Sequence, residues 1–132
     1  MKQYFGTDGI RGIPNKTLSE NLVSKIFSSV EKELLPSSVA VILDTRSSSP
    51  ELLNWICRGL SENVEVINYG VLPSGSMPIL LKNFGHDLGV IISASHNPSE
   101  YNGIKLINDK GSKLSDDVEI KIEKNLEIVS VP

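Results

Sequence analysis

The sequence has little cysteine, few aromatic residues, no long apolar run and no excess of charge of one sign. One cysteine, Cys57, among 132 residues excludes an internal disulfide and a cysteine-based zinc site. The net charge of −3 gives no basic surface typical of nucleic-acid binding. No apolar run approaches the roughly 20 residues that span a bilayer, and no secretion signal opens the chain. We expect a cytoplasmic protein without nucleic-acid or membrane partners.

The length predicts a single domain over residues 1–132 with one core. No repeat, low-complexity tract or internal linker interrupts the chain. Cys57 lies on an apolar helical stripe, so we expect it to be a buried structural thiol.

Helical patterns recur along the chain. Thr17 to Glu20 reads as a capping box before a helix with apolar residues at helical spacing. Ser49 and Pro50 predict the cap and the first residue of a second helix. A third helix is expected over Met77 to Phe84 with a glycine stop, and a last one after Ser115, which is a typical N-cap.

Extended segments alternate with these helices. The continuous apolar run from Val39 to Leu43 predicts a central strand covered on both faces, whereas Val64 to Tyr69 alternates and suits a strand nearer an edge. Further strands are expected at Leu88 to Ile92 and Gly103 to Ile107, with Lys113 and Leu114 beginning a returning strand. This alternation indicates an α/β fold, an α/β/α layered sheet with active loops at the carboxyl ends of strands.

The segment from Ile92 to Pro98 is the most informative in the chain. It places Ser95 on a tight loop at the end of a strand, because Asn favours turns and Pro cannot continue a ladder. Such a hydroxyl is a candidate phosphoryl carrier. A hydrolytic serine activated by His96 is disfavoured, since adjacent side chains on extended backbone point to opposite faces and no G-x-S-x-G elbow is present. His86 precedes the same strand and would have to fold back along its length.

The segment from Ser93 to Pro98, followed by Asn102 to Lys105, resembles the active-serine loop of the α-D-phosphohexomutases. The opening from Phe5 to Gly12 is similar to the start of that superfamily, and most like its phosphoglucosamine mutase branch. The resemblance covers essentially the whole chain but only the first of the family's four domains. It implies a three-layer α/β/α sandwich with a mixed, mainly parallel sheet, and a fragment that is catalytically incomplete by itself.

The resemblance also implies roles for individual residues. Ser95 would rest as a phosphoserine, give its phosphoryl group to a hexose phosphate or hexosamine phosphate, and take the other phosphate back from a hexose 1,6-bisphosphate intermediate. His96 and Asn97 would hydrogen-bond around the phosphate. Ser93 is the competing serine, but it matches a less specific small position. The alternatives are a local turn serine at Ser95 and a surface histidine at His96.

Two cationic side chains complete the predicted site. Lys105 resembles a general acid or base at the sugar hydroxyl, or a group that stabilises transferred charge, and its alternative is a solvated strand lysine. Arg11 is a planar, permanently charged donor suited to phosphate oxygens, between Gly9 and Gly12, which permit close backbone approach. Without the resemblance, this opening segment would be only an N-terminal turn.

Some positions depart from the family pattern. Ile42 and Leu43 stand where a glycine and a basic residue are usual, so for Asp44 and Arg46 we expect a structural ion pair or cap and no catalytic role. The family's magnesium loop lies in later domains, so Mg²⁺ would be met here only through the phosphate of Ser95. The segment from Pro73 to Pro78 also departs, and is expected simply to start the third helix.

Two classes of function therefore remain open. The first is the active-serine domain of a phosphohexomutase, with glucosamine phosphate favoured over mannose or glucose phosphates by the opening segment alone. The second is a stand-alone, non-catalytic module that binds phosphosugars or a protein. The phosphorylatable Ser95, with Lys105 and Arg11, favours the enzyme. Ile42 and Leu43 favour the non-catalytic module, because they depart from the family pattern.

Overall fold

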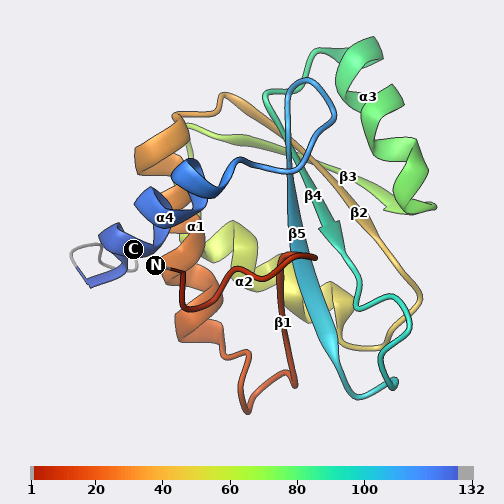
Figure 1. Cartoon of the computed structure of the whole chain (residues 1–132). Coiled ribbons are helices and arrows are strands. Elements are labelled where there is room, and N and C mark those ends of the chain that lie inside the picture. The colour runs from red at the N-terminus through yellow and green to blue at the C-terminus, as the bar shows by residue number, and fades with distance from the viewer. Residues whose placement is uncertain (1, 128–132) are drawn as a thin grey trace.

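A computed structural model describes residues 2–127, and its centre is a five-stranded sheet in the order β1-β5-β4-β2-β3 (Figure 1). The strands are β1 (Ile10–Gly12), β2 (Ser38–Leu43), β3 (Glu65–Val71), β4 (Leu88–Ile92) and β5 (Asn102–Asn108). β2 pairs in parallel with β3 and β4, whereas β5 is antiparallel to both β4 and β1. Only β5 therefore runs against the others, which confirms the mixed, mainly parallel sheet.

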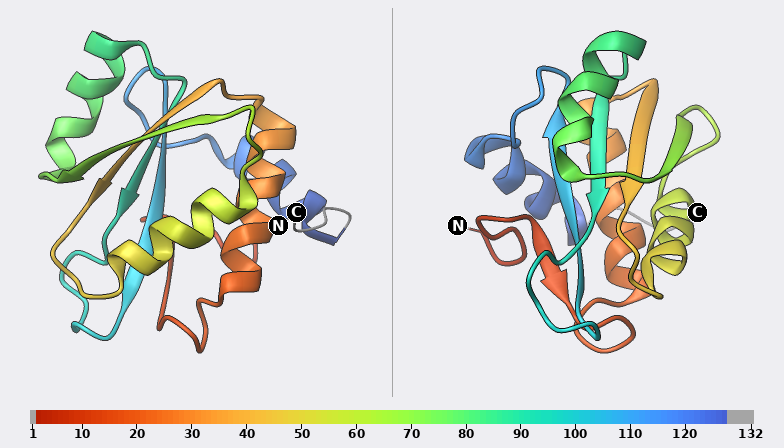
Figure 2. Two further views of the ribbon diagram at one scale, coloured as in Figure 1. Left: turned by 180° about the vertical axis from the view of Figure 1, so that it is seen from behind. Right: turned by 90° about the vertical axis from the view of Figure 1, so that its right-hand side faces the viewer.

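Helices cover both faces of this sheet. α1 (Glu20–Leu34), α2 (Ser49–Gly59) and α4 (Asp116–Lys124) lie on one face, and α3 (Met77–Phe84) lies on the other (Figure 2). Two short 3₁₀ turns, η1 (Ser74–Ser76) and η2 (Asn125–Glu127), precede α3 and follow α4. The three-layer α/β/α prediction is confirmed, and so is the expectation that the segment 73–78 starts the third helix, because α3 begins at Met77.

The core fills the space on both sides of β2. Val39 and Val41 pack towards α1 and α2, while Ala40 and Ile42 pack towards α3, and all four side chains are fully buried. A strand that is covered on both faces needs apolar residues at consecutive positions, since neighbouring side chains point to opposite faces. The prediction of a central strand here is confirmed, as is the edge position of β3.

The starts of the first two helices differ from the prediction. The N-cap of α1 is Ser19, whose hydroxyl accepts from the Leu22 N–H at 3.1 Å, and Thr17 instead accepts from the Ile13 N–H at 2.8 Å. The capping box from Thr17 to Glu20 was therefore wrong, because Thr17 closes the preceding turn. α2 begins one residue before Pro50, with Ser48 at its N-cap.

The burial of Cys57 was also predicted wrongly, because its side chain is exposed. The face of α2 that meets the core carries Leu52, Trp55 and Ile56, and Cys57 lies one position around the helix from it. The predicted apolar stripe of this helix therefore included one residue of its polar face.

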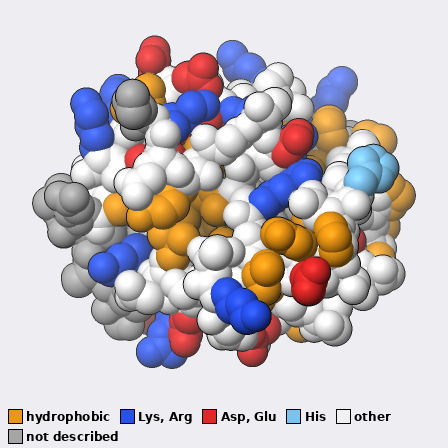
Figure 3. Space-filling view, turned by 60° about the horizontal axis from the view of Figure 1, so that its bottom comes forward, with side chains coloured by type: hydrophobic (Ala, Val, Ile, Leu, Met, Phe, Trp, Pro, Cys, Tyr) orange, Lys and Arg blue, Asp and Glu red, His pale blue; other side chains and the backbone are white. Residues whose placement is uncertain are grey.

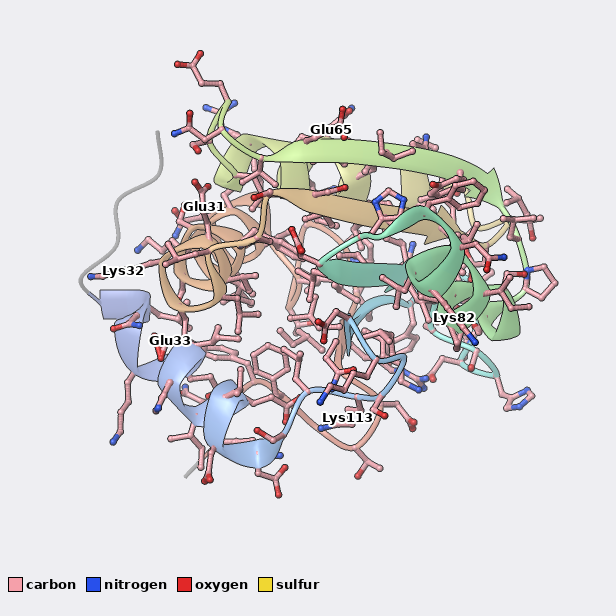
Figure 4. The ribbon with its side chains drawn as sticks, turned by 90° about the horizontal axis from the view of Figure 1, so that it is seen from above. Glu31, Lys32, Glu33, Glu65, Lys82 and Lys113 are labelled. Atoms are coloured by element: carbon pink, nitrogen blue, oxygen red, sulfur yellow. The ribbon has the colours of Figure 1, made fainter. Side chains whose placement is uncertain are left out.

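The predicted returning strand at Lys113 and Leu114 is reduced to a single bridge between Ile107 and Lys113. Lys113 lies on the connection between β5 and α4 (Figure 4), and its ammonium contacts the Glu119 carboxylate at 2.8 Å. Glu119 is only 2% exposed and is also contacted by Lys2 at 3.0 Å. An ion pair holds the chain here in place of a strand.

The cap of α4 was predicted correctly. The Ser115 hydroxyl accepts from the Val118 N–H at 3.3 Å, and acidic residues occupy the first turn, where the helix dipole favours them. Among the residues that the structure describes, no helix is long and apolar enough to cross a membrane.

Candidate active site

The candidate site lies at the carboxyl ends of β2 and β4. These strands are parallel neighbours, so the loops that follow them meet at one edge of the sheet, where the Asp44 N–H donates to the Ile92 carbonyl at 3.0 Å. The two loops line an open pocket formed by Asp44, Thr45, Arg46, Ser47, Ser93, Ser95, Asn97, Ser99 and Glu100. Acidic and basic side chains are interspersed on this end of the molecule (Figure 3).

Ser95 is exposed on the loop between β4 and β5 in the left-handed conformation, with φ of 51°. A residue with a Cβ rarely adopts this conformation unless its surroundings impose it, and such residues cluster at functional sites. Its N–H donates to the Ser93 hydroxyl at 3.0 Å, and the Asn97 N–H closes a turn onto the Ala94 carbonyl at 3.0 Å. The loop presents the Ser95 side chain to solvent.

Arg11 is brought to this loop by the sheet. β1 pairs with β5 so that Arg11 stands opposite Gly103, and its side chain crosses that glycine so closely that an added Cβ would lie 2.8 Å from Arg11 Cγ. Arg11 Nη1 then donates to the Asn97 Oδ1 at 2.7 Å. Its Nε is buried and has no hydrogen-bond partner among residues 2–127, which is unusual for a buried donor.

Lys105 lies on the same face of the sheet as Arg11. It is two residues after Gly103 on β5, opposite Ile91, and is half-buried. Among residues 2–127, its ammonium makes no hydrogen bond or ion pair within the range of a direct contact. The structure thus gathers Ser95, Asn97 and Arg11 at one place and puts Lys105 on the adjoining strand.

His96 is exposed, and in the described part of the chain its ring makes no hydrogen bond. The fold places it beside Ser95 in sequence without orienting its ring. His86 lies at the other end of β4, where Nδ1 is 2.6 Å from the Ser38 hydroxyl and Nε2 is 2.6 Å from the Tyr69 hydroxyl. This position removes His86 from any triad with Ser95, as expected.

The Asp44–Arg46 ion pair predicted from the sequence is present, with Nε of Arg46 3.0 Å from Asp44 Oδ2. Burial pushes the pKa of the Asp44 carboxyl up. Hydrogen bonds outweigh this effect and hold the pKa below its ordinary value of 3.8; they come from the Arg46 N–H, the Ser49 and Ser93 hydroxyls and the Arg46 side chain. The carboxylate is therefore charged in the folded protein, opposite its arginine.

Sequence reasoning missed two sets of hydrogen bonds in this site, one from Arg46 and one from Asn102. The Arg46 guanidinium also donates to four backbone carbonyls in the loop that carries Ser95. The buried Asn102 donates to Ser48 Oγ at 2.8 Å and to Ser49 Oγ at 3.0 Å, which ties the end of the same loop to the start of α2. The order of the strands would have indicated these contacts, because β2 and β4 are parallel neighbours and a residue at the end of β2 therefore lies beside the loop after β4.

The departures at Ile42 and Leu43 have a packing role. Ile42 is fully buried on the α3 side, and Leu43 is 8% exposed on the opposite side. Both fill the core at the end of β2, and Arg46, three residues after Leu43, still reaches the loop after β4.

Comparison with known proteins decides the family. The model of the family described as phosphoglucomutase/phosphomannomutase, alpha/beta/alpha domain I, matches residues 2–130. The chain belongs to this family. It is 43% identical over 141 residues to the phosphoglucosamine mutase of Clostridium kluyveri, with 100% of this chain and 31% of that protein covered. It is 42% identical over 132 residues to that of Clostridioides difficile, with 96% and 30% covered.

The fold of this family member also matches solved structures. A protein from Thermus thermophilus superposes with a TM-score of 0.82 at 23% identity, covering 94% of this chain and 30% of that one, which shows the fold alone. The chain spans about 31% of the length of the Clostridium kluyveri relative. The family prediction made from the serine loop and the opening segment is confirmed.

A magnesium ion does not fit the described residues of this phosphohexomutase domain by themselves. Residues 2–127 contain no group of three His, Cys, Asp or Glu side chains placed to hold a metal ion. Asp44 lines the pocket but is already engaged by Arg46 and Ser49. Since Mg²⁺ requires an octahedral shell of oxygens, Ser95 or a phosphate on it would supply only part of one.

Proposed function

We propose that this chain is the N-terminal, active-serine domain, residues 1–132, of a longer four-domain phosphohexomutase. The observation that carries the proposal is Ser95, exposed on a left-handed turn at the carboxyl end of β4, with Arg11 beside its loop. The whole protein would interconvert glucosamine 6-phosphate and glucosamine 1-phosphate in the cytoplasm. The two relatives named phosphoglucosamine mutases support this sugar over mannose or glucose phosphates.

The proposed reaction uses Ser95 as a phosphoryl carrier. The bond between phosphorus and Ser95 Oγ breaks as a sugar hydroxyl oxygen bonds to the same phosphorus, which gives a hexosamine 1,6-bisphosphate. After this intermediate reorients, its other phosphoryl group returns to Ser95 Oγ, and the product leaves. Phosphoryl transfer passes through a loose transition state with charge on the equatorial oxygens, so it depends on positioning and charge neutralisation more than on a strong base.

The neighbouring residues would supply those two effects. Arg11 has an unpartnered buried Nε donor and a guanidinium held by Asn97, which suits a phosphate oxygen. Lys105, on the same face of the sheet, would hold the proton of the sugar hydroxyl or neutralise the transferred charge. His96 and Asn97 would hydrogen-bond the phosphate from the loop. Mg²⁺ would meet the Ser95 phosphate, with its other ligands supplied by the remaining domains.

The test is phosphopeptide mapping of the complete polypeptide that contains this chain. It would be incubated with Mg²⁺ and glucosamine 1,6-bisphosphate labelled in its phosphates, alongside Ser95→Ala and a matched Ser112→Ala variant, because Ser112 is exposed and lies outside the pocket. We expect label on Ser95, loss of label in Ser95→Ala and normal labelling in Ser112→Ala. Label that persists in Ser95→Ala would move the carrier to another residue.

The same assay separates the remaining alternatives. Faster labelling from mannose or glucose 1,6-bisphosphate would reassign the sugar while keeping the chemistry. A folded protein that takes label from none of the three bisphosphates would point to the non-catalytic module that binds phosphosugars or a protein.

A further inference from the structure

Arg46 uses its entire guanidinium within the protein. Its Nε donates to the Asp44 carboxylate at 3.0 Å. Nη1 donates to the carbonyls of Pro98 at 2.7 Å and Tyr101 at 2.9 Å. Nη2 donates to those of Ser95 at 2.9 Å and Asn97 at 2.9 Å. An arginine has five N–H donors in a rigid fork, so none is left for a phosphate.

Both backbone groups of Ser95 are hydrogen-bonded, the carbonyl by Arg46 and the N–H by Ser93. Arg46 binds its carbonyl directly. The Ser95 N–H donates to the Ser93 hydroxyl at 3.0 Å, and the Ser93 side chain is one of the groups that lower the pKa of the Asp44 carboxyl. The left-handed conformation of Ser95, costly for a residue with a Cβ, is thus held at its carbonyl by Arg46 from the end of β2 and at its N–H by Ser93 from its own loop.

The two arginines of the site differ in whether they have a hydrogen-bond donor left for a ligand. Arg11 keeps a buried Nε donor without a partner among residues 2–127, so it has capacity for a ligand. Arg46 is bound to a carboxylate and to carbonyls that belong to the loop itself, and its side chain is only 11% exposed. Its positive charge is neutralised locally by Asp44, so its effect on the loop comes from the directions of its hydrogen bonds.

We propose that Arg46, oriented by Asp44, is a positioning residue for the phosphoryl carrier, which sets the direction of Ser95 Oγ by clamping the backbone from Ser95 to Tyr101. This inference rests on the proposed function, because it assigns Arg46 a part in the same transfer. It predicts that the planar fork matters and that positive charge at this position is not sufficient. Lysine at position 46 keeps the charge, but its three donors radiate from one nitrogen and cannot reproduce five directed bonds.

The experiment compares Arg46→Lys with wild type in the complete polypeptide that contains this chain, with Arg58→Lys as the matched control. Arg58 is 60% exposed and meets Glu20 at 3.4 Å on the surface. Since misplacing reacting groups by about 1 Å can cost about 100-fold in rate, we expect Arg46→Lys to lower kcat and Ser95 labelling by about 100-fold. The KM for the sugar phosphate should stay near that of wild type, because Arg46 does not touch substrate. Arg58→Lys should match wild type in both constants.

Hydrogen exchange measured by NMR supplies a readout that needs no turnover. In Arg46→Lys, the amides of Ser95 and Asn97 should exchange faster, whereas those of β2 and β4 should exchange as in wild type. Ser93→Ala, which removes the acceptor of the Ser95 N–H but leaves Arg46 intact, should loosen the Ser95 amide and lower kcat to a smaller extent.

The outcomes distinguish this inference from the proposed function. Label that survives in Ser95→Ala would overturn the proposed function. A wild type that labels on Ser95 while Arg46→Lys labels equally fast would overturn the positioning role alone. Faster exchange across the whole sheet in Arg46→Lys would also overturn it, because Arg46 would then be a general stability element. Unchanged exchange at Ser95 and Asn97 would show that the clamp does not hold the loop.

Discussion

Gly9→Ala is the substitution that the fold should tolerate least among the glycines of the opening segment. Gly9 has φ of 84°, and a Cβ at this position would lie 2.2 Å from the Ile104 carbonyl oxygen and 2.9 Å from Lys105 Cα. Both atoms belong to the backbone of β5, which is held on either side by β1 and β4, so the clash cannot be relieved by a side-chain rotation.

The cost has two parts. The left-handed conformation costs a residue with a Cβ about 1–2 kcal/mol, and overpacking against fixed atoms typically costs about 1–3 kcal/mol. Alanine recovers about 0.4–1 kcal/mol by restricting the unfolded chain. We therefore expect the free energy of unfolding to fall by about 2–4 kcal/mol. Arg11 lies two residues further on, so its contact with Asn97 should be lost as the segment lifts from β5.

Urea denaturation of the 132-residue chain, followed by circular dichroism, measures this change. Gly75→Ala is the matched control, because nothing lies within 4 Å of a Cβ at that position. Its unfolding free energy should stay within about 0.5 kcal/mol of wild type, as for most surface substitutions. A Gly9→Ala chain as stable as the Gly75→Ala chain would refute the close packing of the opening segment on β5.

Two further predictions concern carboxylates. The pKa of Asp44 is lowered on folding, so its contribution to stability is present above the unfolded value of about 3.8 and is lost as the pH falls through the lower folded value. Asp44→Asn should therefore be less stable than wild type at pH 7, and thermal unfolding should show the difference shrinking at acid pH; a constant difference would contradict the ion pair. The Glu123 carboxylate accepts the N–H groups of Gln3, Tyr4 and Phe5. Glu123→Ala should cost about 1–2 kcal/mol and speed the exchange of those three amides, while the exposed Glu62→Ala should do neither.

Much of the fold is encoded locally in the sequence. Helix and strand bury side chains with different periods, so the apolar run at β2 and the helical spacing after Ser19 indicate which faces are covered. The glycine after α3 indicates where that helix ends. The serine loop and the opening segment identified the family, since their residues are contiguous. Local errors arose where one pattern had two explanations. Thr17 was assigned to the helix when it caps a turn, and Cys57 was counted on a stripe that it only borders.

The tertiary structure alone decided how the site is assembled. Arg46 and the carbonyls it binds are about 50 residues apart, with separations of 49 to 55 along the chain. They meet only because β2 lies beside β4 in the sheet, and strand order is not written in the period of either strand. The same holds for Arg11 and Asn97, which are 86 residues apart and joined through the pairing of β1 with β5. The sequence by itself determined the layers and the family, and it predicted Ser95 as the reactive serine. The pairing of strands determined which side chains hold that serine, because hydrogen bonds between loops depend on three-dimensional neighbours that no local pattern specifies.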